Sequence, residues 1–146
     1  TSFTPMTGIL RQPVGKEVYR DWELGPELGR GASCVTRLAF ARHNGCTAAC
    51  KTIHKSGIFR SAAVKAAVLG VQRELAIMQH TSGHPNVVQL KGVYEDSRSL
   101  HLVLEWCGGG SLTQLAEKAP GGRCGEGAAA AVAKAVLEVL AVCHSK

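Results

Sequence analysis

Residues 28–35 read LGRGASCV, and a lysine stands further along the chain at residue 51. Gly29 and Gly31 carry no Cβ, so the backbone can bend tightly there and its N–H groups can approach a phosphate. Three small residues complete this open stretch: Ala32, Ser33 and Cys34. The composition indicates a loop that can lie over an anionic group.

The stretch after this loop predicts a β-hairpin. Residues 35–41 alternate apolar and polar side chains with period two, which is typical of a strand. His43-Asn44-Gly45 then favours a tight turn, because Asn-Gly accepts positive φ. A second strand is expected over residues 46–53, and it contains Lys51. The sequence therefore predicts a glycine-rich hairpin that covers an anion, with one ammonium group directed to the same place.

Other classes of glycine-rich segment fit less well. A Gly-x-Gly alone also fits an ordinary flexible turn. A dinucleotide-binding fold would continue into a helix and place an acidic residue about 20 positions later. Here a strand is expected instead, and between Glu27 and Glu74 there are eight Lys or Arg residues and no Asp or Glu. A Walker A loop is excluded because no Gly-Lys-Ser or Gly-Lys-Thr follows the glycines.

Composition limits the class of protein. With 146 residues, 45% hydrophobic and 19% charged, the chain is long enough for one domain with a core. The net charge of +6 indicates a solvated basic surface rather than a nucleic-acid site, because only 5% of the residues are aromatic. Six cysteines without Cys-x-x-Cys spacing, and no signal peptide, favour free thiols in a reducing compartment. A zinc site of Cys46, Cys50, His43 and His54 is a weaker alternative, and no metal site is expected.

A helix is predicted over residues 64–78, where apolar residues recur at spacings of four and three. Glu74 lies on or beside this apolar stripe. A carboxylate that leans into a core needs a partner. Glu74 is therefore either a flank residue turned to water or an ion-pair partner of Lys51.

The remaining segments complete the predicted organisation. Residues 1–18 contain Pro and Gly without periodicity and are interpreted as an extended leader. Residues 86–94 and 100–106 predict two further strands, and residues 111–118 a short helix. The apolar segment 126–144 falls short of the about 20 uninterrupted apolar residues that span a membrane. Lys134 and Glu138 interrupt it, so a buried helix of a soluble protein is expected.

Five motifs together resemble one known family. They are LGRGASCV at 28–35, Ala49-Cys50-Lys51, Glu74, His84-Pro85-Asn86 and LVLE at 102–105. As a set they resemble, in this order, the glycine-rich loop, the strand-three lysine, the αC glutamate, the stretch before strand four and the hinge of eukaryotic Ser/Thr protein kinases. Within that family the chain is most similar to the calcium/calmodulin-dependent group, and in particular to plant and algal calcium-dependent protein kinases. The resemblance covers residues 18–146.

The resemblance implies an α+β fold. Residues 19–107 would form the kinase small lobe, a five-stranded antiparallel sheet with the αC helix, and residues 108–146 the hinge exit and the first two helices of the large lobe. The domain would be incomplete. The implied activity is transfer of the γ-phosphoryl group of Mg-ATP to protein hydroxyls. The implied partners are ATP, protein substrates and a calmodulin-like regulatory region or calcium sensor, and the implied location is intracellular, in the cytoplasm.

The resemblance also implies a site. Lys51, held by Glu74, would position the α- and β-phosphates. Leu104 would be the gatekeeper behind the adenine, and Glu105 and Cys107 would bind the base through their backbones. Apolar surfaces above the base would come from Leu28, Val35 and Ala49. The implied nucleotide-binding residues are Leu28, Gly29, Gly31, Ala32, Ser33, Cys34, Val35, Ala49, Lys51, Leu104, Glu105 and Cys107.

The chain departs from the family pattern at three places. Cys34 replaces the third glycine of the loop, and Ser111 stands where many relatives carry a glutamate for the ribose. The His-Arg-Asp motif and the magnesium ligands do not occur within these 146 residues. This leaves two alternatives open: a non-catalytic regulatory fragment that binds nucleotide or a partner kinase, and a gene product without a stable fold.

Overall fold

The computed structural model describes residues 17–31, 34–55 and 63–145, with the side chains of the last segment described from residue 69 onward. The leader predicted over residues 1–18 lies almost entirely outside the described residues. In chain order the elements are α1 (Val18–Asp21), β1 (Trp22–Arg30), β2 (Cys34–Ala41), β3 (Thr47–His54), α2 (Ala63–His80), β4 (Leu90–Glu95), β5 (Ser99–Leu104), α3 (Leu112–Lys118), the 3-10 turn η2 (Pro120–Gly122) and α4 (Glu126–His144).

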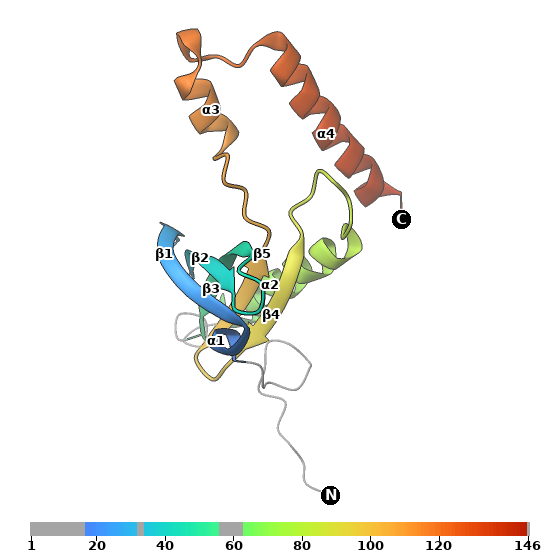
Figure 1. Cartoon of the computed structure of the whole chain (residues 1–146). Helices are drawn as coiled ribbons and strands as arrows, with labels where there is room; N and C mark the ends of the chain where they lie inside the picture. The colour runs from blue at the N-terminus through green and yellow to red at the C-terminus, as the bar shows by residue number, and fades with distance from the viewer. Residues whose placement is uncertain (1–16, 32–33, 56–62, 146) are drawn as a thin grey trace, which may run out of the picture.

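The strands form one antiparallel sheet in the order β1-β2-β3-β5-β4. Helix α2 lies against this sheet, and α3 stands away from it beyond a connecting segment. Helix α4 runs back toward the loop after α2, where the Asn86 side-chain amide donates to Glu138 Oε2 at 3.0 Å (Figure 1). The β2–β3 hairpin has the predicted turn: Gly45 has φ +67°, and the Asn44 side chain accepts a hydrogen bond from the Cys46 N–H at 3.0 Å. The asparagine thus supplies the turn's hydrogen bond and the glycine its left-handed backbone.

The register of the strands separates two faces of the sheet. Thr36, Lys51 and Leu102 are directly paired across β2, β3 and β5. Directly paired residues share a face, and adjacent residues in a strand take opposite faces. We call the face with Lys51 the inner face and the face with Thr52 the outer face.

Each face has its own apolar cluster. On the inner face, Val71 and Leu75 of α2 pack with Ile53, Leu100 and Leu102 of the sheet. This packing uses the predicted helical stripe, and each buried aliphatic side chain stabilises the fold by about 1.5–3 kcal/mol. On the outer face a second cluster gathers around Trp22 and Tyr94, whose hydroxyl accepts a hydrogen bond from Trp22 Nε1 at 2.9 Å. Strand β5 contributes to both clusters and is buried along almost its whole length.

A buried ion pair closes one end of the sheet. Lys55 Nζ lies 2.7 Å from Glu95 Oε1, and the two side chains are only 8% and 2% exposed. Lys55 Nζ also donates to the backbone carbonyl of Asp96. Two opposite charges can remain buried here because each has the other as a partner.

Three predicted features differ from the structure. Val18, assigned to the leader, is 2% exposed and packs in the outer cluster. The strand predicted from residue 86 begins only at Leu90, because the Gln89 side chain binds the His84 and Val87 carbonyls and stabilises a turn.

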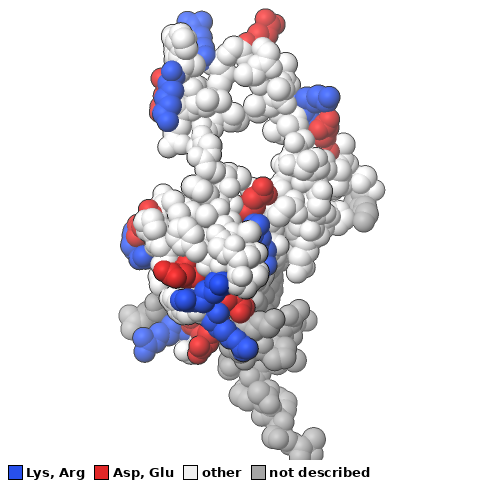
Figure 2. Space-filling view, viewed as in Figure 1, with Lys and Arg blue, Asp and Glu red and all other residues white. Residues whose placement is uncertain are grey.

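Helix α4 is the third difference. It was predicted to be buried, but no residue of α4 is buried in the structure. Its mean hydropathy of 1.6 and its length would by themselves also suit a membrane span. Figure 2 shows the part of the molecule formed by α3 and α4 with few charges on the visible side. The helix therefore leaves most of its apolar surface exposed in the described part of the chain.

Candidate functional site

The inner face brings Lys51 and Glu74 together. Lys51 Nζ donates to Glu74 Oε1 at 2.8 Å, which joins β3 to α2. Glu74 precedes Leu75 on α2, and the packing of Leu75 against the sheet turns the carboxylate toward β3. The side chains are 27% and 39% exposed. An ammonium group that is fixed by one carboxylate and still accessible can bind a second anion.

The glycine-rich segment forms the end of β1. Gly29 pairs with Thr36, and the Gly31 N–H donates to the Cys34 carbonyl at 2.8 Å. Neither glycine has positive φ, and a Cβ at Gly29 would meet nothing within 4 Å. The backbone conformation therefore does not require a glycine at position 29. The lack of a side chain at this position leaves open space over the inner face. Ala32 and Ser33, also predicted for this site, lie outside the described residues.

Cys34 stands at the start of β2 rather than at the tip of the loop. It pairs with Ile53 and is partly buried against the inner cluster. A Cβ at Gly31 would lie 3.0 Å from its sulfur. The thiol therefore contacts the base of the glycine-rich segment from the side of the sheet.

The residues predicted around the adenine include a compact row on the inner face. Ala49 pairs with Leu38 on one side and with Leu104 on the other. Leu104 also pairs with Leu90 and is partly buried against the inner cluster. Leu28 is 47% exposed.

Val35 requires a correction. It was predicted to supply an apolar surface above the base, but it pairs with Thr52 and so lies on the outer face. Thr36, the next residue, pairs with Lys51 and occupies the inner position instead. Thr36 and Leu38 were missed by sequence reasoning. Counting the period-two alternation across the turn from Lys51 would have found them.

The predicted hinge follows β5 directly. The Glu105 N–H donates to the Gln89 carbonyl at 2.8 Å, and the Glu105 carboxylate accepts from the Gln89 N–H at 3.2 Å. Cys107 follows shortly after and is exposed. Ser111, one of the departures noted above, caps α3: its hydroxyl accepts from the Gln114 N–H in a capping box. Its hydroxyl therefore has a structural role at the helix start.

Comparison with known proteins identifies the family. The family model "Protein kinase domain" matches residues 22–146. The chain belongs to the protein kinase domain family. The expected α+β kinase fold is thereby confirmed.

Individual relatives and a solved kinase structure agree with this assignment. The chain is 40% identical to "Calcium-dependent protein kinase 34" of Arabidopsis thaliana over 142 residues, which cover 97% of this chain and 26% of that relative. It is 42% identical to "Calcium-dependent protein kinase 2" of Oryza sativa subsp. japonica, with 97% and 26% coverage. The chain thus spans about a quarter of the length of these relatives, 26% in both cases. The solved structure "Rad53 1-466 in complex with AMP-PNP" matches 88% of this chain and 32% of its own, with TM-score 0.75 and 32% identity.

Proposed function

We propose that this chain is the nucleotide-binding part of a calcium-dependent Ser/Thr protein kinase, which transfers the γ-phosphoryl group of Mg-ATP to protein hydroxyls. The observation that carries the proposal is the 2.8 Å contact between Lys51 and Glu74 beneath an open glycine segment. In protein kinases this ion pair must be in place for phosphoryl transfer. The solved Rad53 structure is a complex with AMP-PNP, which supports the choice of ligand.

The described residues suit three parts of the nucleotide. Backbone N–H groups of the segment around Gly29 and Gly31 would hold the phosphates together with Lys51. Ala49, Leu104 and Thr36 would contact the base from the sheet. The Glu105 carbonyl and the Cys107 N–H would bind its edge. Leu28, Ala32, Ser33 and Cys34 complete the proposed site.

Residues outside this chain would supply the rest of the chemistry. Mg²⁺ would neutralise charge on the phosphates, and its protein ligands are not among these 146 residues. We assign residues 19–107 to the small lobe and 108–146 to the hinge exit and first helices of the large lobe. In the full protein we expect an intracellular location, protein substrates and calcium regulation. The names of the relatives, calcium-dependent protein kinases, support this expectation.

The test uses the intact kinase that contains this chain. Lys51→Met should abolish phosphoryl transfer without unfolding the protein, because the pair is only half-buried. Glu74→Gln should lower the rate, and the double variant should be no worse than Lys51→Met alone, since one ion pair is lost only once. The matched control is Lys91→Met, which removes an exposed lysine of β4. Full activity in Lys51→Met, or additive losses in the double variant, would refute the proposal.

A further inference from the structure

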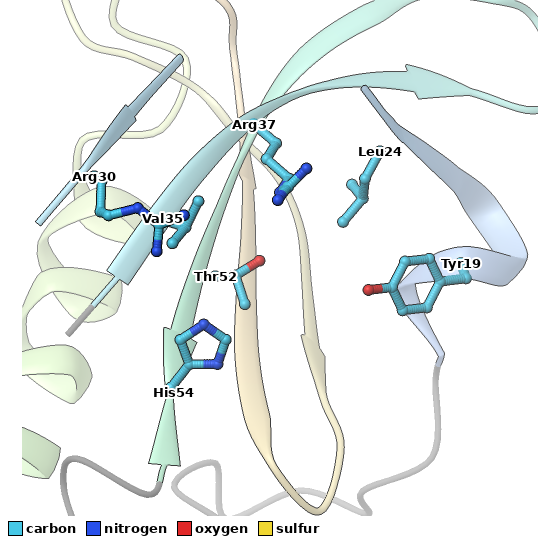
Figure 3. Close-up of a pocket in the computed structure, with 7 residues that line it drawn as sticks. All are labelled: Tyr19, Leu24, Arg30, Val35, Arg37, Thr52 and His54. Carbon is cyan, nitrogen blue, oxygen red and sulfur yellow. The ribbon is translucent and has the colours of Figure 1, made fainter. Parts of the chain in front are cut away.

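A second pocket lies on the outer face of the sheet, away from the Lys51 side. It has a volume of about 380 Å³ and is lined by residues of α1, β1, β2 and β3 (Figure 3). This volume falls in the range of small-molecule sites, about 300–1,000 Å³. Because Val35 and Thr52 line it, the register places it on the opposite face from the nucleotide site.

Two arginines, Arg30 and Arg37, give this pocket positive charge. His54 also lines it, and no Asp or Glu of the described residues does. Figure 3 shows the Arg37 guanidinium directed into the space between Leu24 and Thr52. Arg37 is partly buried, its Nη1 reaches the Gly25 carbonyl at 3.4 Å, and no carboxylate of the described residues lies within ion-pair distance of it. Its remaining N–H donors are available to an anion.

The carboxylate that faces Arg37 across the strands already has an ion-pair partner. Glu27 pairs with Arg37 across the strands but forms its ion pair with Arg30, at 2.7 Å. The Arg30 hydrogen bond lowers the pKa of Glu27, and the charge of Arg37 adds to this effect. Glu27 thus reduces, but does not cancel, the positive charge of the two arginines.

The rest of the pocket is apolar apart from the hydroxyls of Thr52 and Tyr19. Leu24, Val35 and the Tyr19 ring form its walls. The Thr52 hydroxyl lies 2.9 Å from His101 Nδ1, whose Nε2 lies 3.1 Å from Asp96 Oδ2. The Thr52 hydroxyl is thus already engaged with His101, which leaves Arg37 and Arg30 as the charged donors of the pocket.

We propose that this outer-face pocket binds a small ligand with one phosphate or carboxylate group on an apolar, ring-sized body. The anion would bind Arg37, with Arg30 and His54 beside it, because guanidinium groups match the geometry of both anions. The apolar body would contact Leu24 and Val35. The site is independent of the nucleotide site, since its residues lie on the other face of the sheet.

The experiment measures binding of phenyl phosphate to the full chain by titration calorimetry, with inorganic phosphate as the comparison. Phenyl phosphate should bind saturably and more tightly than inorganic phosphate, which lacks the apolar body. Arg37→Gln should weaken phenyl phosphate binding about tenfold or more, the value expected for lost hydrogen bonds to a charged group. Glu27→Gln should strengthen it about two- to fivefold by releasing Arg30.

Two control variants separate this site from other causes of anion binding. Arg123→Gln removes an equal charge at an exposed position between η2 and α4 and should change the affinity less than about twofold. Phenyl phosphate that binds at the nucleotide site instead would lose affinity in Lys51→Met and keep it in Arg37→Gln.

Four results would overturn the proposal: no saturable binding, equal affinity for the two phosphates, an equal loss in Arg123→Gln, or a loss confined to Lys51→Met. If Arg37→Gln does not fold, as judged by thermal melting, Glu27→Gln decides, since an unchanged affinity in that variant also overturns it.

Discussion

Two ion pairs of this chain have nearly equal length and very different burial, and this difference predicts opposite roles. Lys51–Glu74 spans 2.8 Å with side chains 27% and 39% exposed, and Lys55–Glu95 spans 2.7 Å with side chains 8% and 2% exposed. The same substitution, Glu→Gln, can be made in both. It keeps the shape of the side chain and removes its charge.

The expected losses of stability follow from burial. Glu95→Gln leaves the Lys55 ammonium buried without its counter-charge, which typically costs about 3–5 kcal/mol. Glu74→Gln leaves a lysine that water can reach, and pairs of that kind contribute about 0.2–1 kcal/mol. We therefore predict that Glu95→Gln lowers the free energy of unfolding by about 3 kcal/mol. For Glu74→Gln we expect at most about 1 kcal/mol.

Urea unfolding followed by far-ultraviolet circular dichroism measures both effects. With a denaturant slope of about 2 kcal/mol/M, Glu95→Gln should lower the midpoint by about 1.5 M and Glu74→Gln by about 0.5 M or less. The double variant Lys55→Met, Glu95→Gln should recover part of the loss, because no uncompensated charge remains buried. The reasoning is refuted if Glu95→Gln is no more destabilising than Glu74→Gln, or if the double variant is worse than the single one.

Three further predictions concern reactivity, pH and activity. Mg-ATP should slow alkylation of Cys107 at the hinge, as measured by mass spectrometry. Alkylation of Cys46, the exposed thiol in the β2–β3 turn, should be unchanged, and equal protection of both thiols would contradict the hinge assignment. Burial raises the pKa of Asp96, but N–H groups of Arg98 and Ser99 and the His101 ring outweigh it, so the folded-state pKa is lowered. The Asp96 carboxylate should therefore stabilise the fold above about pH 4, and this contribution should be lost as pH falls through the lower folded-state pKa. In unfolding experiments, the difference in stability between wild type and Asp96→Asn should then disappear in acid. Residues 1–146 alone should transfer no labelled phosphate from Mg-ATP to a basic protein substrate, because the catalytic base and metal ligands of kinases are not among them; Lys51-dependent transfer would contradict this.

Local patterns predicted the elements better than they predicted which way side chains point. The hairpin strands begin and end within one residue of the positions expected from alternation and the Asn-Gly turn. The Lys51–Glu74 contact agrees with the prediction drawn from the family motif. Val35 was assigned to the wrong face because the motif was matched by residue type, whereas the face depends on register, which pairs Val35 with Thr52.

Features that depend on distant segments were beyond the reach of the sequence patterns. The turn at residues 86–89 looked like a strand because the Gln89 side-chain bonds that stabilise it leave no periodic signal. The burial of α4 was inferred from its apolar composition, but burial also needs packing partners, and the described part of the chain buries no residue of α4. The outer-face pocket combines side chains from four elements, and no single window of sequence contains them.

The length of the β2–β3 turn keeps Lys51 on the inner face of the sheet and away from Arg30 and Arg37 on the outer face. Lys51 and Thr52 are neighbours in β3, yet one belongs to the inner face and the other to the pocket side. If one residue were inserted after Gly45 and the strand slipped by one position, every β3 side chain would change faces. Lys51 would then take the place of Thr52 on the pocket side with Arg37, and Cys50 would take the place of Lys51 opposite Glu74. Natural variation in this turn is thus expected to preserve strand register, by absorbing any extra residue within the loop itself.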